Sequence, residues 1–344
     1  MTATVAAKDA GSRFLLRPRT LSLLLGLAIA CMMLASLRIG YTPLSTATLL
    51  KAAVGQSEAA YNTIVQHLRL PRTLLAVLVG AALGGSGALL QGLLRNPLAE
   101  AGTLGIGSAA GLGAVIALYF GFASLSPFLL PLFAMAGSLA CMGLLLVVSR
   151  RANTTLTLVL VGIAISSLCV ALTSLAMNLS ASPWAVAEIV MWLMGSLRDR
   201  TMAEVSLAAP FILPGLALML LVAPRLDTLS LGEDTARSLG QNVDRTRWLI
   251  IASTSLAVGA SVSVSGSISF VGLIVPHMVR PLLGHLPGRA VLPSMLGGAL
   301  IVLTADTLVR IISVGPELQL GVVTALVGSP LFLRMVFRLH RRPE

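Results

Sequence analysis

Few residues of this 344-residue chain have charged or reactive side chains, and lysine is the rarest of these residue types. A phosphate-binding loop of the type GxxxxGK[ST] uses its lysine to reach the β- and γ-phosphates of a nucleotide. The chain has two lysines, Lys8 and Lys51, and neither follows that pattern. The chain therefore lacks a P-loop, and any ATP-driven role requires a separate ATPase subunit.

The other reactive residues do not group into a site. Three cysteines lie in apolar segments without metal-ligand or disulfide spacing, so we interpret them as packing residues. They are Cys31, Cys141 and Cys169. His277 has no acidic residue near it in sequence, which favours a structural role over a proton relay. Asp306 lies inside an apolar segment, where acids can bind ions, but Arg310 four residues later predicts an ion pair. We expect no cofactor, no bound metal and no catalytic activity.

The densest charge lies in the stretch Arg225–Arg247, where eight of 23 residues are charged. Long apolar segments flank this stretch, and burying its charges in hydrocarbon would be costly, so it must lie outside the lipid. Within it, Gly232–Gly240 has two acids at its start and Arg237 near its end, which suits a helix dipole. Gly240 is placed to end that helix in a left-handed conformation. The sequence predicts a short capped helix that contacts a partner protein; the alternative is a solvated loop.

The composition places these residues in a membrane protein. The chain is 56% hydrophobic and 11% charged, with a mean hydropathy of +0.93, whereas soluble domains contain about 25% charged residues. Long apolar runs without alternation predict helices rather than a barrel. The net charge is +11, but the basic residues stand singly between apolar segments. This pattern indicates membrane topology rather than a nucleic-acid partner.

Ten apolar segments are long enough, or nearly so, to cross the membrane. They are Leu21–Leu37, the segment that begins after Arg72 and ends at Leu94, Thr103–Phe120, Phe128–Ser149, Thr157–Leu179, Val205–Ala223, Trp248–Ser263, Ile268–Leu283, Ala290–Ile312 and Leu318–Phe337. We also expect a short helix at Leu44–Val54 and an interfacial helix at Pro183–Leu197. Residues 1–20 form a cytoplasmic segment, and residues 21–344 form one transmembrane domain. A cytoplasmic N-terminus leaves 17 of the 24 basic residues inside, which predicts that the C-terminus and the 225–247 loop are cytoplasmic too.

The two halves of the chain resemble each other at an offset of 179 residues. Val79-Gly80-Ala81 matches Val258-Gly259-Ala260, and Ser86-Gly87 matches Ser265-Gly266. Pro97 matches Pro276, and we expect both prolines to start or break helices at equivalent places. The matching spans are the second and the seventh, which cross in opposite directions. The predicted fold is therefore an all-α polytopic membrane protein with ten transmembrane helices and an inverted five-helix repeat.

Six separated motifs then resemble one family. They are Arg69-Leu70-Pro71-Arg72; Asn96-Pro97-Leu98-Ala99-Glu100 with Leu104-Gly105; Leu231-Gly232-Glu233-Asp234 with Ser238-Leu239-Gly240; Phe270–His277 with Arg280; Ala305-Asp306; and Gly321-Val322-Val323-Thr324 with Gly328 and Pro330. From about Arg69 to its end, the chain resembles the permease subunits of ABC importers for iron–siderophore complexes, haem and cobalamin. Ala101 stands where that family usually has proline.

The resemblance implies a lipid-embedded permease dimer that binds two ATPase subunits and receives cargo from a periplasmic or lipid-anchored binding protein. It implies a coupling helix whose ATPase contacts are Gly232, Glu233, Asp234, Arg237, Ser238, Leu239 and Gly240. It suggests that Arg69, Arg72 and Arg310 meet acids of the binding protein, with interfacial snorkelling or a local ion pair as the alternatives.

The family places the fifth and tenth spans at the dimer axis, so these spans should line the pathway. Candidates there are Ser166, Ser167, Thr173, Ser174, Met177, Thr324 and Ser329. Ferric siderophore is the first cargo choice, followed by haem and cobalamin. An ion-driven transporter and a channel are the alternative classes, and a heterodimer with a paralogue stays open beside the homodimer.

Overall fold

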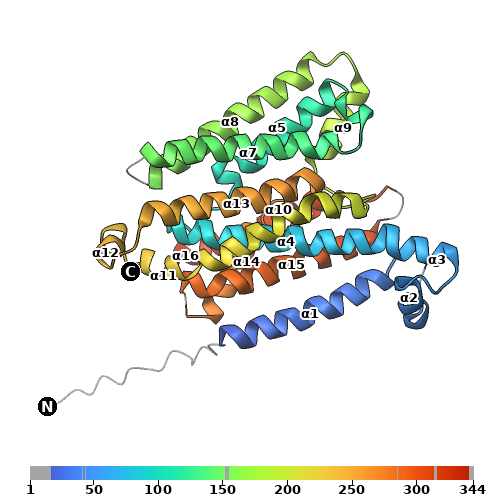
Figure 1. The fold of residues 1–344 in the computed structure, drawn as a ribbon, viewed down its shortest axis with the longest axis horizontal. Helices are drawn as coiled ribbons and strands as arrows, with labels where there is room; N and C mark the ends of the chain where they lie inside the picture. Colours follow the sequence, from blue (N-terminus) through green and yellow to red (C-terminus); the bar gives the residue numbers. More distant parts are fainter. Residues whose placement is uncertain are drawn as a thin grey trace.

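A computed structural model describes residues 17–40, 42, 44–151, 155–284, 286–313 and 316–340. All regular elements in these ranges are helices (Figure 1), which confirms the all-α prediction. In chain order they are α1 (Pro18–Arg38), α2 (Thr46–Ala53), α3 (Ala59–Thr63), η1 (Ile64–Arg69), α4 (Leu70–Leu94), η2 (Ala101–Leu104), α5 (Ile106–Tyr119), α6 (Phe122–Leu125), α7 (Leu129–Arg151), α8 (Thr155–Leu179), α9 (Pro183–Leu193), α10 (Met202–Val222), α11 (Pro224–Leu229), α12 (Glu233–Ser238), α13 (Val243–Ser265), α14 (Val271–Val279), η3 (Arg280–Leu282), α15 (Pro287–Ile312) and α16 (Leu320–His340). Most of the predicted segment 1–20 lies outside the described residues.

Seven helices of the described residues are long and apolar enough to cross a membrane. The other three predicted spans are shorter: Ile106–Tyr119, Val271–Leu282 and the apolar part of α16, Leu320–Arg334. At 1.5 Å per residue, the 14-residue α5 is about 21 Å long, less than the roughly 30 Å hydrocarbon core. By length and composition, seven of the ten predicted spans are therefore long enough to cross the membrane.

Two predicted helix limits are wrong for local reasons. The second span does not begin after Arg72, because the chain is already helical from Ala59, through the π-helical turn η1, into α4. Pro71 lies inside this continuous helix, just after the π-helical turn, and has no N–H to donate to the preceding turn. Pro97 lies in a turn after α4, whereas Pro276 lies inside α14, so the two prolines are not equivalent.

The inverted repeat is visible in the packing of the two halves. Gly80 of α4 lies against the backbone of Gly298 in α15, and Gly259 of α13 lies against Ser138 in α7. Helices α15 and α7 are the ninth and fourth predicted spans, so glycines at equivalent positions face equivalent partners. The short helices α5 and α14 also correspond, because the residues that precede them are both left-handed, Gly105 at φ 76° and Phe270 at φ 68°.

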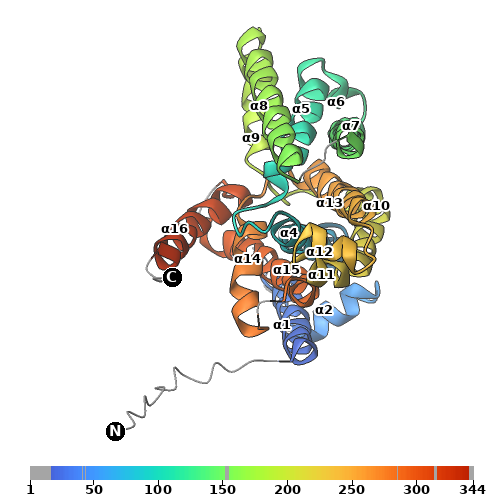
Figure 2. The same ribbon diagram turned by 90° about the vertical axis from the view of Figure 1, so that its left-hand side faces the viewer.

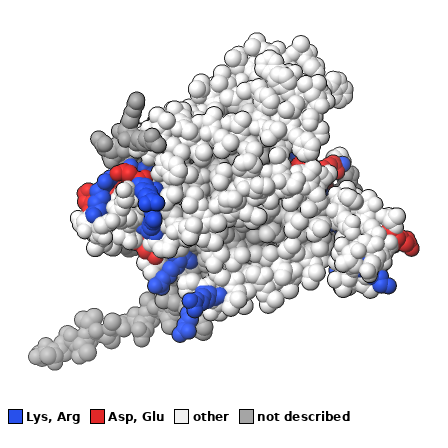
Figure 3. Space-filling view, viewed as in Figure 1, with Lys and Arg blue, Asp and Glu red and all other residues white. Residues whose placement is uncertain are grey.

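The helices form a core around α4 and a lobe that packs against α13 of that core (Figures 1 and 2). Helices α5, α6, α7, α8 and α9 form a lobe on one side, and α4, α10, α13, α14 and α15 form the core, with α1 on its opposite face. Helices α11 and α12 mark one end of the molecule, and α2, α3 and α9 lie toward the other. Charged side chains gather at these two ends and leave a broad uncharged middle on the face drawn in Figure 3, as a membrane-embedded surface requires.

Candidate functional site: the handle and the far charge cluster

The predicted short helix is present, with a glycine at each end, whereas its contact with a partner protein stays a prediction. We call residues Pro224–Asn242, which include α11 and α12, the handle. Helix α12 spans Glu233–Ser238, inside the predicted Gly232–Gly240. Gly240 has φ 82°, and its N–H donates to Arg237 O at 2.9 Å while Gln241 N–H donates to Ala236 O at 2.9 Å. This pair of bonds is the Schellman stop that a left-handed glycine permits, which confirms the predicted helix end.

Ion pairs attach the handle to the start of α13. The fully buried guanidinium of Arg247 lies 3.1 Å from Glu233 and 3.2 Å from Asp244. Arg237 pairs with Asp244 at 3.3 Å in a more exposed position. Two of the predicted ATPase contacts, Glu233 and Arg237, therefore also hold the handle in place. Two leucines of the handle are exposed on either side of α12, Leu231 at 63% and Leu239 at 64%.

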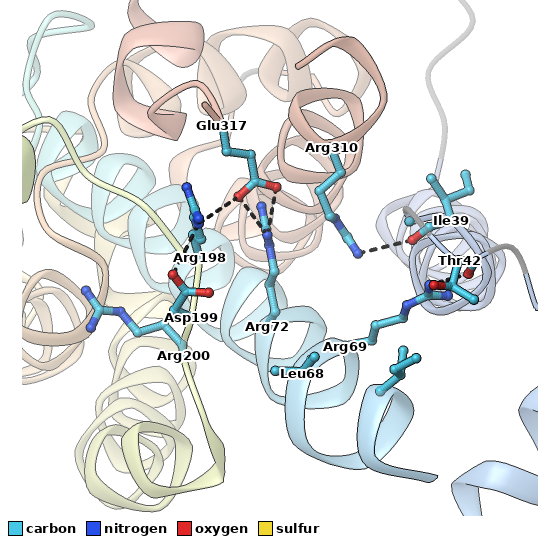
Figure 4. Close-up of a pocket in the computed structure, with 12 residues that line it drawn as sticks. Ile39, Thr42, Leu68, Arg69, Arg72, Arg198, Asp199, Arg200, Arg310 and Glu317 are labelled. Carbon is cyan, nitrogen blue, oxygen red and sulfur yellow. Dashed lines mark hydrogen bonds and ion pairs between the residues drawn. The ribbon is translucent and has the colours of Figure 1, made fainter. Parts of the chain in front are cut away.

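At the other end of the molecule, two acids share Arg72. We call Arg69, Arg72, Asp306, Arg310 and Glu317 the far charge cluster. Arg72 lies 2.8 Å from Asp306 and 3.0 Å from Glu317. Asp306 also pairs with Arg310 at 3.0 Å, one helical turn away, which confirms the predicted Asp306–Arg310 pair. Figure 4 shows Arg72 beneath Glu317, and Arg310 reaching toward the chain at Ile39.

The other arginines of the cluster stabilise the end of α1. Arg69 donates to the carbonyls of Leu37 and Arg38 at 2.9 and 3.0 Å, and Arg310 donates to Ser36 O at 3.1 Å. The last carbonyls of a helix lack helical partners and carry partial negative charge, so guanidinium groups suit them. The three arginines predicted to dock a binding protein thus lie together, but as largely buried side chains with partners inside the chain.

A cavity of about 300 Å³ opens beside the cluster (Figure 4). The connection between α9 and α10 contributes Arg198, Asp199 and Arg200 to its lining. Arg198 is 54% exposed and pairs with Asp199 at 3.1 Å. Burial lowers the pKa of the Arg200 guanidinium, an effect that Glu204 and Asp199 oppose. Sequence reasoning missed Glu317 and this connection, because only the fold brings them to Arg72.

The residues predicted to line the pathway differ in burial: some are buried, some are half-buried and some are exposed. Ser166 shares a 2.8 Å hydrogen bond with Ser108 of α5, and Thr173 and Thr324 are buried. Ser329 lines a cavity of about 490 Å³ with Ser267 and Ser269, between the end of α9, the chain before α14, and α16. The exposed candidates are Ser167, Ser174 and Ser329, and Met177 is half-buried.

Known proteins share both the sequence and this architecture. Residues 27–338 match the FecCD transport family. The chain is 36% identical to an Fe(3+)-citrate import system permease protein of Bacillus subtilis over 93% of this chain and 95% of the relative. It is 38% identical to a hemin transport system permease protein of Yersinia pestis, over 94% and 96%. A solved metal-chelate type ABC transporter in an inward-facing conformation superposes with a TM-score of 0.84 and 33% identity, covering 94% of this chain and all of that one. The chain therefore belongs to the FecCD transport family, as a multi-pass permease of a metal-chelate type ABC importer and not an enzyme.

Proposed function

We propose that this permease carries a ferric siderophore into the cytoplasm, the cargo being delivered by a binding protein at the far end. The relatives named for ferric citrate and hemin both handle iron held by an organic ligand, which supports an iron chelate. Haem and cobalamin are the alternative cargoes. An ion-driven transporter gains no support, because Asp306, the acid that it would use, is paired with Arg72 and Arg310.

The handle carries the proposed coupling to ATP hydrolysis. Helix α12 is capped at its C-terminus, attached to α13 by a buried arginine and tipped by an exposed leucine. A rigid projection with an apolar tip suits insertion into a cleft of an ATPase subunit, and predicted contacts Gly232, Asp234 and Ser238 lie on the same short helix or at its start. In this arrangement the handle, both termini and the two ATPase subunits lie on the cytoplasmic side of the membrane.

The cargo would pass between two copies of the chain, along α8 and α16. Both helices present exposed apolar side chains with a few small hydroxyls, such as Ser174 and Ser329. A wall of this kind binds a large chelate weakly, which favours release over retention. ATP-driven closure of the ATPase subunits would push the handles and reorient the helices around this pathway.

Reconstitution tests the proposal directly. The permease, its two ATPase subunits and its binding protein are placed in vesicles, and uptake of a ferric siderophore, haem and cobalamin is compared. We expect ATP-dependent uptake of the siderophore, and preferred uptake of haem or cobalamin would replace the cargo assignment. Leu239→Glu should abolish binding-protein-stimulated ATP hydrolysis. Leu125→Glu, at a leucine that is 75% exposed and remote from the handle, should preserve it. Unchanged coupling in Leu239→Glu would refute the role of α12.

A further inference from the structure

The base of the handle, α11, lies in a notch between the ends of α4 and α15. Leu226 and Leu229 of α11 are buried. Two glycines leave the space for it: a Cβ at Gly92 would lie 3.0 Å from a methyl group of Leu226, and a Cβ at Gly288 would lie 3.0 Å from the Asp227 carboxylate. Helix α11 is therefore in direct contact with both long helices.

Two hydrogen bonds attach α11 to these helix ends. The Asp227 carboxylate accepts from Gly288 N–H at 2.7 Å. Gly288 is the second residue of α15, so its N–H has no acceptor within the helix, and a carboxylate suits the positive end of the helix dipole. Arg95, which follows α4 in a left-handed conformation, donates to Leu229 O, the carbonyl of the last residue of α11, at 2.7 Å.

Helices α4 and α15 are also joined along their length and at the far end. Gly80 and Gly84 of α4 lie against the backbone of Gly298 and Ser294 in α15, too close for any side chain between them. At the far end, Arg72 of α4 pairs with Asp306 of α15 at 2.8 Å. Packed helices with contacts at both ends and the middle resist bending, so they move together rather than deform.

We propose that Arg95 and Asp227 are positioning residues through which the handle moves α4 and α15 as one body. Displacement of α12 passes to α11, and the two hydrogen bonds deliver it to both long helices at once. Because these helices carry Arg72 and Asp306 at their other ends, the same movement reaches the far charge cluster. Coupling of this kind is reciprocal, so an event at the far cluster also reaches the handle. The inference rests on the proposed contact between the handle and an ATPase subunit.

The test compares variants that remove each hydrogen bond with variants that retain it. Arg95→Met removes the donor and Arg95→Lys keeps one; Asp227→Ala removes the acceptor and Asp227→Asn keeps it. In the full importer in vesicles, we measure bound ATPase subunits, basal ATP hydrolysis and its stimulation by the binding protein. Arg95→Met and Asp227→Ala should keep the ATPase subunits and basal hydrolysis but lose about tenfold in stimulation, the effect of one charge-assisted hydrogen bond. Arg95→Lys and Asp227→Asn should stay within about twofold of the wild type.

A matched control is Arg289→Met, in the same turn of α15 as Gly288. Within the described residues the Arg289 side chain makes no hydrogen bond or ion pair, so we expect wild-type stimulation. Full stimulation in Arg95→Met and Asp227→Ala would overturn the proposal, as would an equal loss in Arg95→Lys and Asp227→Asn. Loss of the ATPase subunits from these variants would also overturn it, because α11 would then serve attachment. If the wild-type permease itself bound no ATPase subunit, the proposed function would fail instead. Because Arg95 and Asp227 make separate hydrogen bonds, either Arg95→Met or Asp227→Ala alone tests the proposal if the other variant does not fold.

Discussion

The Arg247 guanidinium is completely buried and donates to the Glu233 carboxylate at 3.1 Å, across 14 positions of sequence. The contact joins the first turn of α12 to the second turn of α13, and Asp244 adds a second carboxylate at 3.2 Å. The two acids are partly exposed, at 28% and 57%, while the arginine has no contact with solvent. The charge that cannot be solvated is therefore the arginine, and this asymmetry has measurable consequences.

Removing the acids should cost more stability than removing the arginine. In Glu233→Gln with Asp244→Asn, a buried charge loses both carboxylates, and we expect the free energy of unfolding to fall by about 3 kcal/mol. Arg247→Met removes the buried charge and releases the two acids to solvent, at a cost of about 1 kcal/mol. Chemical unfolding in detergent measures both values. The exposed pair is the control: Arg237→Gln should cost under about 1 kcal/mol. A double variant no less stable than Arg247→Met would contradict this ranking.

The two acids that share Arg72 should differ in the same way. Asp306 is 1% exposed and holds both Arg72 and Arg310, so Asp306→Asn should lower the free energy of unfolding by about 3 kcal/mol. Glu317→Gln should cost about 1 kcal/mol, because Arg72 keeps Asp306 as its partner. Thermal unfolding of the purified permease compares the two variants. Equal melting temperatures of the two variants would contradict this prediction, because Glu317 would then contribute as much to stability as Asp306.

The sequence was a good guide to elements whose cause is local. Gly240 ends α12 as predicted, because a positive φ is a property of one residue and its immediate neighbours. The Asp306–Arg310 pair was predictable for the same reason, since the i,i+4 spacing of a helix brings the two side chains together.

Contacts between distant elements could not be predicted from local pattern. Arg69 donates to the carbonyls of Leu37 and Arg38 in α1 and of Thr42 beyond it, acceptors that no sequence motif marks. Glu317 was not predicted to be a site residue because its partner Arg72 is 245 residues away.

The offset of 179 residues between the two halves correctly identified Gly80 and Gly259 as equivalent positions, but it also paired Pro97 with Pro276, which are not equivalent. Beyond Gly87 and Gly266 the two halves diverge, since α4 continues to Leu94 whereas α13 ends at Ser265.

Burial of Glu100 predicts a pH dependence of stability. Glu100 lies in the turn between α4 and η2, and desolvation raises the pKa of its carboxyl above the ordinary value of 4.5. The folded state therefore holds this proton more tightly than the unfolded state does. As the pH falls from neutral toward 4.5, the contribution of the Glu100 carboxyl to the free energy of unfolding should increase. As the pH rises through the pKa of the folded state, that contribution is lost.

Glu100→Gln, which cannot ionise, isolates that contribution. We expect a higher melting temperature than the wild type at neutral pH, and a difference that shrinks as the pH approaches 4.5. Thermal unfolding at several pH values measures it. Glu58→Gln is the control, because Glu58 is exposed. A difference that does not change with pH would assign the effect to packing instead of protonation.

Docking of an acidic partner at the far end is best tested at the exposed Arg198. Reversing Arg72 would break its internal pairs with Asp306 and Glu317, so a loss of affinity there would not report on docking alone. Arg198 lines the cavity and is 54% exposed; its side chain pairs with the exposed Asp199 and makes a longer contact of 3.9 Å with Glu317. Its reversal therefore disturbs the chain less than reversal of Arg72, and Arg198→Glu should weaken binding-protein affinity about tenfold by placing like charges together. The loss should diminish as salt rises, because exposed charges are screened. Arg38→Glu makes the same charge change at an exposed residue of the same end, outside the cavity lining, and should bind normally. Equal affinity of Arg198→Glu and wild type at low salt would exclude the α9–α10 connection from the docking surface.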